Sequence, residues 1–331
     1  GFVAEDPDFA AKCADAGLIF LGPSSESMRL AGDKIAAKRL AEANGVPVVP
    51  WSKEPVSTLE EVAQWAEKIG YPLALKAAAG GGGRGIRMVH AAGELEAAFQ
   101  SSRQEALRAF GDDRVFVERC ITRARHLEVQ VAVGADGVGQ AYGVRDCTVQ
   151  RRHQKLIEES PGPLTTKERV AELERHALAF ATAAGYQGVG TVEFIVDATR
   201  DAAYFMEMNT RLQVEHPVTE CVYGIDLVKT MIRIARGESA PSAPAPRGAA
   251  VEVRLNAEDP EQGFAPAPGR VHRFVVPQGP GIRVDSGVER GVTISPDFDS
   301  NIAKVIAWGS TRKEAISRLA RALSLSLSLS L

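Results

Sequence analysis

Hydrophobic and polar positions along this chain follow two periods, one typical of α-helices and one typical of β-strands. A helical period, bounded by capping residues or by Gly and Pro, predicts helices over residues 25–44, 57–69, 92–110 and 165–184. Alternation or short apolar runs predict strands over residues 17–22, 72–76, 86–89, 115–120, 126–133, 140–145, 191–196, 203–208, 251–256, 270–276 and 301–307. This mixture, with several antiparallel hairpins, indicates the α/β (α+β) fold class.

Local signals refine the ends of these elements. Ser57 with Glu60, and Thr165 with Glu168, are predicted to form capping boxes at two helix starts. Residues 238–249, rich in Pro, Ala and Ser, are predicted to form a connector.

A glycine-rich loop follows Lys76, between two of the predicted strands. Its core is the run Gly80, Gly81, Gly82 and Gly83. Consecutive glycines expose their backbone N–H groups without Cβ atoms in the way, which suits a flap closing over phosphate oxygens. The loop lacks the GK[ST] ending of a Walker A motif, and no helix follows it directly. The alternative is a flexible surface linker, although linkers seldom lie between two short apolar strands.

Polar side chains alternate along residues 207–215. If the segment is one extended strand, it has a polar face made of Glu207, Asn209, Arg211, Gln213 and Glu215. Carboxylate and amide oxygens suit Mg²⁺, and an arginine fork suits a small oxyanion. Glu193 would bring a second carboxylate to this place if its strand pairs with strand 203–208. The alternative is a solvated sheet face with compensating charges.

A basic cluster lies between Arg145 and Lys155, with Asp146 as its one acid. Such a cluster needs counterions, which Glu158 and Glu159 or bound phosphates could supply. The alternative is a solvated basic turn or an internal salt-bridge network. Nucleic acid is a poorer explanation, because no aromatic residues are interleaved with the basic ones.

Composition narrows the function classes. The 331 residues carry 39 Lys and Arg against 42 Asp and Glu, so the net charge of −3 argues against nucleic acid as the main partner. The apolar runs are far shorter than the roughly 20 residues that cross a membrane. The four cysteines form no CxxC pair, which favours reduced thiols over a disulfide framework or a zinc site.

Seven sequence motifs, in this order, carry a resemblance to a known family. They are GDK (32–34), Lys76 with its glycine flap, RHLEVQV (125–131), RDCTVQRRHQK (145–155), GTVEF (190–194), EMNTRLQVEHPVTE (207–220) and RLNAEDP (254–260). With them the chain resembles, from Gly1 to about Ala322, the biotin carboxylase component of biotin-dependent carboxylases, members of the ATP-grasp superfamily.

The resemblance implies an ATP-grasp fold with a small lid domain that carries the glycine flap. By this comparison residues 1–48 are the remnant of an N-terminal α/β domain with a connecting helix. Residues 49–120 would form the lid, and residues 121–331 a C-terminal domain that is itself truncated. The alternating Leu-Ser tail from Leu323 is low-complexity sequence, from which no function is inferred.

The resemblance also implies a set of site residues. ATP would be bound by Lys34, Lys76, Gly80, Gly81, Gly82, Gly83, Glu118, Ile121, His126, Gln150 and His153, of which Glu118 and Ile121 would meet adenine. Magnesium would be bound by Glu193, Glu207 and Asn209. Bicarbonate would be bound by Lys155, Arg211, Gln213, Val214 and Glu215. Among the catalytic residues, Lys155, Arg211, Glu215 and Arg254, Glu215 would act as general base and Arg254 would face biotin.

The implied reaction is the MgATP-dependent carboxylation of biotin with bicarbonate, the first half-reaction of an acyl-CoA carboxylase. Mn²⁺ is an alternative metal. Biotin would arrive on a carrier domain, and the other expected partners are a carboxyltransferase, on the same or another chain, and a second copy of this chain. The expected compartment is the cytoplasm, or the mitochondrial matrix if a transit peptide precedes Gly1. The alternatives are a pyruvate or other non-CoA carboxylase, another ATP-grasp ligase that phosphorylates bicarbonate or a carboxylate, and a non-catalytic scaffold.

Overall fold

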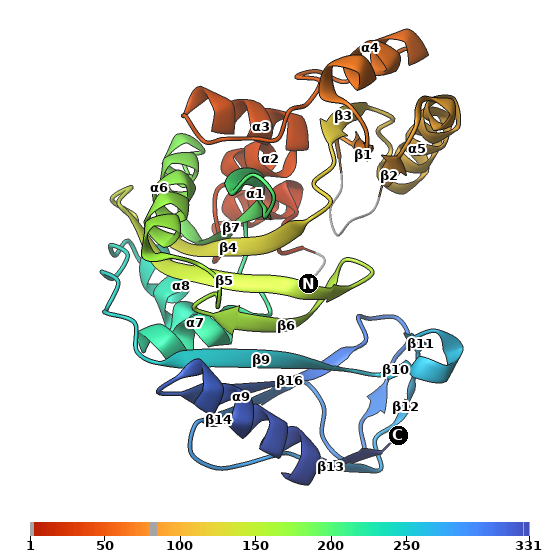
Figure 1. The fold of residues 1–331 in the computed structure, drawn as a ribbon. Coiled ribbons are helices and arrows are strands. Elements are labelled where there is room, and N and C mark those ends of the chain that lie inside the picture. Colours follow the sequence, from red (N-terminus) through yellow and green to blue (C-terminus); the bar gives the residue numbers. More distant parts are fainter. Residues whose placement is uncertain (1–2, 80–84, 327, 331) are drawn as a thin grey trace. The chain divides into compact units, whose positions relative to one another are not determined.

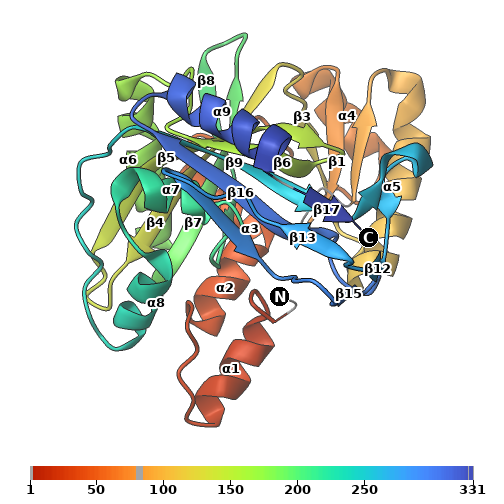
Figure 2. The ribbon, with the colours of Figure 1, turned by 90° about the horizontal axis from the view of Figure 1, so that it is seen from below.

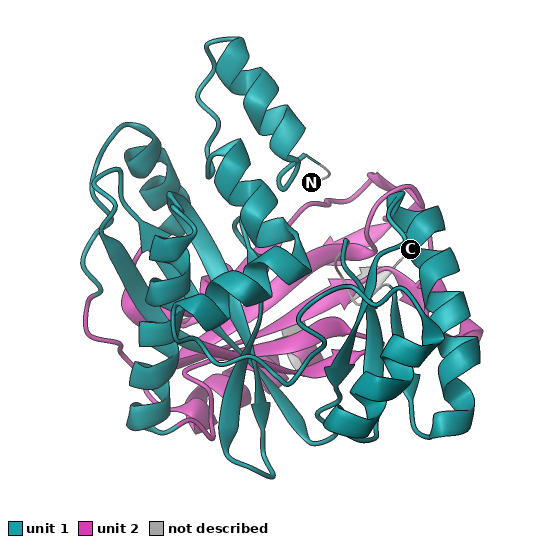
Figure 3. Ribbon diagram, turned by 90° about the horizontal axis from the view of Figure 1, so that it is seen from above, with its two compact units in different colours: residues 1–144, 166–213, 226–243 teal, residues 145–165, 214–225, 244–331 magenta. Residues whose placement is uncertain are grey.

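A computed structural model describes residues 3–79, 85–326 and 328–330, and the chain divides into two compact units. Unit 1 comprises Gly1–Val144, Thr166–Gln213 and Asp226–Ala243, and unit 2 comprises Arg145–Thr165, Val214–Ile225 and Pro244–Leu331 (Figure 3). The domain boundaries expected near residues 48 and 120 stay a prediction.

Unit 1 contains seven α-helices in its described residues: α1 (Pro7–Asp15), α2 (Ser25–Gly32), α3 (Lys34–Ala43), α4 (Leu59–Ile69), α5 (Leu95–Phe110), α6 (Lys167–Ala183) and α8 (Leu227–Ala235). The short helix η1 (Ala92–Glu94) precedes α5. The strands of unit 1 are β1 (Leu73–Ala77), β2 (Ile86–Val89), β3 (Val115–Arg119), β4 (Ala124–Val133), β7 (Gly188–Asp197) and β8 (Ala202–Asn209). Strand β5 (Gly139–Arg151) begins in unit 1 and ends in unit 2.

The sheet β4-β7-β8 has one apolar and one polar face. Its strands pair antiparallel, and apolar residues lie opposite apolar residues on neighbouring strands, as Val129, Val192 and Met208 do. The apolar face packs against α6, where the Phe180 and Phe205 rings stack with their centroids 4.4 Å apart (Figure 1). The strand predicted over residues 126–133 is confirmed within β4, and its side chains alternate between the two faces, so the carboxylates of this sheet lie on the face turned away from the core.

A second sheet of unit 1 has the order β2-β1-β3 and packs against α4 and α5 (Figure 1). The predicted hairpin on either side of the glycine loop is confirmed, with Lys76 opposite Ile86. The glycine run itself, residues 80–83, lies outside the described residues.

Unit 2 is built on the antiparallel order β14-β16-β9-β6-β5. Its strands and helices are β6 (Gln154–Ser160), α7 (His216–Tyr223), β9 (Ala249–Asn256), β10 (Glu258–Asp259), η2 (Pro260–Gln262), β11 (Ala265–Pro266), β12 (Gly269–Arg270), β13 (Arg273–Val275), β14 (Ile282–Ser286), β15 (Thr293–Ile294), β16 (Asn301–Gly309), α9 (Arg312–Arg321), η3 (Ala322–Ser326) and β17 (Ser328–Ser330). Helix α9 lies across β9 and β16, where Ala315 and Leu319 enter the core (Figure 2).

Three of the predicted elements differ from the structure. The predicted strand 270–276 is two short strands, β12 and β13, because its two ends pair with different partner strands, β15 and β17. Residues 17–22 form no strand: Leu18 and Ile19 are 64% and 72% exposed, and the described residues offer this segment no neighbouring strand. The predicted helix 25–44 is two helices, because Asp33 takes an extended conformation and caps α3 by accepting from the Ile35 and Ala36 amides.

The two predicted capping boxes are each wrong by one residue. Thr58 with Glu61 forms the box of α4, and Thr166 accepts from the Arg169 amide at the start of α6. The cap is the last residue with extended backbone, and the sequence pattern alone left that residue ambiguous.

Candidate active site

Three lysines of unit 1 pair with two carboxylates, and two of the lysines share one of them, the buried Glu118. Lys34 and Lys38 lie one turn apart on α3, and Lys76 lies on β1, where its neighbour β3 carries Glu118. The Glu118 carboxylate contacts the Lys38 ammonium at 2.5 Å and the Lys76 ammonium at 2.5 Å. The Lys34 ammonium contacts Glu207 at 2.6 Å.

Burial and charge set the ionisation of this cluster. Burial by itself would raise the pKa of Glu118, but Lys38 and Lys76 outweigh it and lower this pKa to about 2. Burial, together with the neighbouring Lys76 and Lys34, lowers the pKa of Lys38 although Glu118 raises it. Burial also opposes the charge on Lys34, yet the Glu207 carboxylate raises its pKa overall. A phosphate group, which needs several cationic donors, fits such a group of lysines.

Three carboxylates lie side by side on the polar face of the sheet β4-β7-β8. Glu128, Glu193 and Glu207 occupy directly opposed positions on successive strands, which confirms the predicted pairing of the strands of Glu193 and Glu207. Like charges in opposed positions destabilise a sheet unless cations intervene. The His126 Nε2 atom lies 3.1 Å from the Glu193 carboxylate, and Lys34 forms an ion pair with Glu207.

Amide side chains complete the surroundings of Glu193. Its Oε1 atom accepts from Asn209 at 2.8 Å and from Gln213 at 3.0 Å. The donor set of Glu193, Glu207 and the Asn209 amide oxygen fits a magnesium ion, which prefers carboxylate and amide oxygens and would relieve the repulsion between the opposed carboxylates. Lys34, Glu207, Asn209 and Arg211 also line a cavity of about 390 Å³.

The single strand predicted over residues 207–215 is correct only up to Asn209. Strand β8 ends at Asn209, and Glu215 takes the position before α7, whose first turn contains Pro217. Arg211 binds Glu5 at 2.9 Å. The chain leaves the extended conformation here, so the five polar side chains do not share one strand face.

Unit 2 holds an ion-pair network around Glu215. The Glu215 carboxylate accepts from Lys155 at 2.6 Å and from Arg254 at 3.0 Å, and Arg254 also binds Glu158 at 2.6 Å. Burial would raise the pKa of Glu215, but Lys155, Arg145 and Arg254 lower it to about 2. Burial opposes the charge on Arg254, whereas Glu158 and Glu215 raise its pKa.

The remaining predicted ligands fall at three places. Gln150 donates to the Cys147 carbonyl at 2.8 Å, and His153 stands exposed in the turn between β5 and β6. Ile121 follows β3 directly and is half-buried. The predicted bicarbonate ligands are divided: Arg211 and Gln213 belong to unit 1, whereas Lys155, Val214 and Glu215 belong to unit 2.

Three buried charged residues were not predicted as site residues: Lys38, Glu158 and Glu252. Lys38 could have been found from its place four residues after Lys34 on an apolar helix face. Glu252 lies within a strand of mostly apolar neighbours, where a carboxylate is unexpected, whereas the polar strand of Glu158 carries no such signal.

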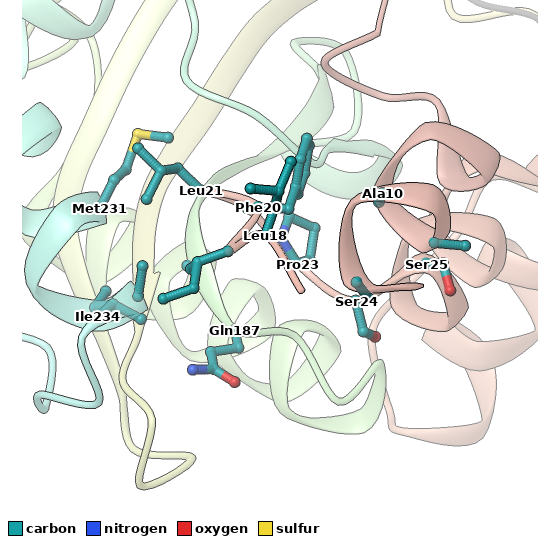
Figure 4. Close-up of a pocket in the computed structure, with 16 residues that line it drawn as sticks. Ala10, Leu18, Phe20, Leu21, Pro23, Ser24, Ser25, Gln187, Met231 and Ile234 are labelled. Atoms are coloured by element: carbon teal, nitrogen blue, oxygen red, sulfur yellow. The ribbon is translucent and has the colours of Figure 1, made fainter. Parts of the chain in front are cut away.

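A second cavity, of about 340 Å³, lies in unit 1 and shares no lining residue with the first (Figure 4). It is lined by α1, residues 18–25, Gln187 and Gly188, and α8, with side chains such as Phe20, Met231 and Ile234. None of its lining residues is acidic or basic, so it offers no charged side chain for acid–base chemistry.

Comparison with known proteins agrees with this geometry. Residues 33–242 match the family model "Carbamoyl-phosphate synthase L chain, ATP binding domain", residues 252–327 match "Biotin carboxylase C-terminal domain", and residues 1–28 match "Biotin carboxylase, N-terminal domain". The fold and the lysine and carboxylate clusters define an ATP-grasp protein of the ATP-dependent ligase class.

The chain belongs to the biotin carboxylase family. It is 46% identical over 328 residues to biotin carboxylase of Nostoc sp., covering 98% of this chain and 73% of that protein. It is 44% identical over 327 residues to chloroplastic biotin carboxylase of Arabidopsis thaliana, again over 98% of this chain but 61% of the relative, so it spans about two thirds of such proteins.

Solved structures give the same result. A biotin carboxylase from Campylobacter jejuni, in a complex with a β,γ-ATP compound, superposes with a TM-score of 0.96 at 42% identity, covering 100% of this chain and 74% of that one. The biotin carboxylase domain of the 2-oxoglutarate carboxylase of Hydrogenobacter thermophilus, a dimer with MgADP and bicarbonate, superposes with a TM-score of 0.95 at 42% identity over 99% and 73%. Within the described residues of this chain, no helix combines the length and hydropathy that a membrane span requires.

Proposed function

We propose that this chain catalyses the MgATP-dependent carboxylation of biotin with bicarbonate. The observation that carries the proposal is the Lys155–Glu215–Arg254 network, where a buried base lies between two cations suited to an oxyanion. The likeness to the bicarbonate-bound 2-oxoglutarate carboxylase domain supports it.

In this proposal Lys34 and Lys76, with the flap glycines, bind the phosphates of ATP. Glu193, Glu207 and Asn209 hold magnesium, which when bound neutralises phosphate charge. Glu118 positions Lys38 and Lys76 by ion pairing. Catalysis of phosphoryl transfer is mostly positioning and charge neutralisation, and these residues supply both.

Glu215 removes the proton of bicarbonate in this scheme, and a bicarbonate oxygen then attacks the γ-phosphorus of ATP. The new O–P bond gives carboxyphosphate, and the bond to ADP breaks. Its pairing with Lys155 and Arg254 makes Glu215 a weak base in the ligand-free protein. Bicarbonate oxygens that take over these two cations would return basicity to Glu215 at the moment of reaction.

Carboxyphosphate then breaks its C–O bond to give CO₂ and phosphate. The phosphate takes the proton of biotin N1, the new C–N bond forms with CO₂, and Arg254 stabilises negative charge on the ureido oxygen. An arginine suits this role, because it keeps its charge and offers two parallel donors.

We also propose that the chain serves an acyl-CoA carboxylase, together with a biotin carrier domain, a carboxyltransferase and a second copy of itself. The segments VPVVPWS (46–52) and RARHLEV (123–129) support the acyl-CoA assignment by resemblance. A component of a biotin-dependent acyl-coenzyme A carboxylase of Mycobacterium leprae is 46% identical, but a component of the pyruvate carboxylase of Methanothermobacter thermautotrophicus is 45% identical. The acceptor therefore needs its own test.

The experiment is an ATP hydrolysis assay on the complete enzyme, with bicarbonate and with or without biotin. We expect stimulation by biotin, and Glu215→Gln should abolish carboxylation while ATP still binds. ATP turnover that ignores biotin would favour another ATP-grasp ligase, and near-normal turnover by Glu215→Gln would exclude Glu215 as the base. Carboxylation of acyl-CoA or of pyruvate by the same preparation then identifies the acceptor.

A further inference from the structure

The turn between β5 and β6 is built from residues that disfavour its backbone conformation. Arg151 pairs with Gln154 across a two-residue connection, and both residues of that connection have positive φ angles, Arg152 at 51° and His153 at 67°. A two-residue turn of this kind favours Asn and Gly, because side chains with a Cβ atom are strained there. Other contacts must therefore hold this turn.

Those contacts come from residues 258–264. The Arg151 guanidinium lies 3.9 Å from the centre of the Phe264 ring and is ion-paired with Glu258. The Arg152 guanidinium donates to the Gly263 carbonyl at 3.3 Å. Both Arg151 and Arg152 are therefore held by contacts with residues 258–264.

Glu258 and Phe264, which contact Arg151, are themselves fixed by hydrogen bonds. Glu258 accepts from Ser300 at 2.7 Å, and its side chain is only 10% exposed. Phe264 has a φ of 63° and donates its amide to the Asp259 carbonyl at 2.7 Å, which closes the loop around η2. Among the described residues five non-glycine residues have positive φ, and Arg152, His153 and Phe264 are three of them. Strain concentrated in this way marks functional sites.

We propose that Arg151, Glu258 and Phe264 form a clamp that holds the Arg152–His153 turn in its left-handed conformation. The clamp residues act as positioning residues: they present His153 to the nucleotide and fix the start of β6, whose second residue is Lys155. This role rests on the proposed function, because His153 and Lys155 matter only if ATP and bicarbonate bind there.

The test removes the clamp and then relieves the strain. Phe264→Ala removes the ring under Arg151, and Glu258→Gln removes its charge partner. Phe298→Ala is the matched control, since Phe298 is a 69% exposed phenylalanine of the same unit and no part of the clamp. Phe264→Tyr keeps the aromatic face and should behave as the parent does.

Two readouts are measured on the complete enzyme. The first is the rate at which trypsin cuts after Arg151 and Arg152, identified by the masses of the peptides. We expect Phe264→Ala and Glu258→Gln to speed this cleavage by roughly tenfold, the scale of the strain at one such residue. The second is the KM for ATP, which should rise by about tenfold with a smaller change in kcat.

Arg152→Gly in the Phe264→Ala background is the decisive variant. Glycine adopts positive φ without strain, so the double variant should recover most of the KM for ATP and slow the cleavage after Arg151. A merely structural role of Phe264 would show no such rescue, and that result would overturn the proposal. Unchanged cleavage and KM in both single variants would overturn it too.

The proteolysis readout keeps this test separate from the proposed function. It needs no catalytic activity, so it decides whether the clamp exists even in an enzyme that ignores biotin. Clamp variants that open the turn but leave the KM for ATP unchanged in an active enzyme would overturn the positioning role while leaving the proposed function intact.

Discussion

Replacing Glu118 by Gln removes the one carboxylate that Lys38 and Lys76 share. Glu118 is 5% exposed and Lys38 is 3% exposed, so neither water nor salt can replace the lost charge efficiently. The variant leaves two ammonium groups facing a neutral amide. We expect a large loss of folding stability.

The magnitude follows from the pKa of Glu118. This pKa is lowered from 4.5 to about 2, and at about 1.4 kcal/mol per pKa unit the difference corresponds to about 3 kcal/mol of stabilisation at neutral pH. The folded pKa is the lower one, so the stabilisation is fully present above about pH 4.5 and is lost as the pH falls towards 2. The difference between the parent and Glu118→Gln should therefore begin to shrink below about pH 4.5.

Urea denaturation at pH 7 and at pH 4 measures both effects. Asp113→Asn is the matched control, because the Arg103–Asp113 pair is more than 40% exposed on both sides and should cost less than about 1 kcal/mol. A loss below about 1 kcal/mol for Glu118→Gln at pH 7, equal to the control, would refute the reasoning. So would a loss that stays constant from pH 7 to pH 4.

Three further predictions concern single side chains. Burial, with Glu158 and Glu215 nearby, raises the pKa of Glu252 well above its usual value, so Glu252→Gln should stabilise the fold at neutral pH and lose this advantage below about pH 4.5, by urea denaturation at both pH values; destabilisation at pH 7 would contradict this. Arg254→Lys keeps the positive charge that bicarbonate needs but cannot span Glu158 and Glu215 with one fork, so it should lower biotin carboxylation by more than about tenfold and biotin-independent ATP hydrolysis by clearly less; equal losses in both assays would exclude a role specific to biotin. Glu193→Gln should raise the Mg²⁺ concentration for half-maximal activity by about tenfold or more, and an unchanged magnesium titration would exclude Glu193 as a ligand.

Local pattern predicted most of the secondary structure and much of the chemistry. Alternation along residues 126–131 and the apolar strand around Glu193 predicted correctly which face of the sheet would be polar. This works because the side chains of a strand alternate whatever its neighbours are. The same rule failed after Asn209, where the chain leaves the strand and alternation no longer assigns a face.

Residues in tertiary contact were harder to predict. Lys38 was missed because a lysine on a helix is normally exposed, and only the approach of β3 buries it against Glu118. The strand predicted over residues 17–22 failed for the converse reason, since an apolar run becomes a strand only beside a partner strand.

By itself, the sequence determined the order of elements, the polar face of the sheet and, through its motifs, the family. Only the tertiary structure decided which charges meet: Lys38 and Lys76 on Glu118, Lys34 on Glu207, and Lys155 with Arg254 on Glu215. These partners lie 39 to 173 residues apart in sequence, so strand register and helix packing, rather than local periodicity, bring them together.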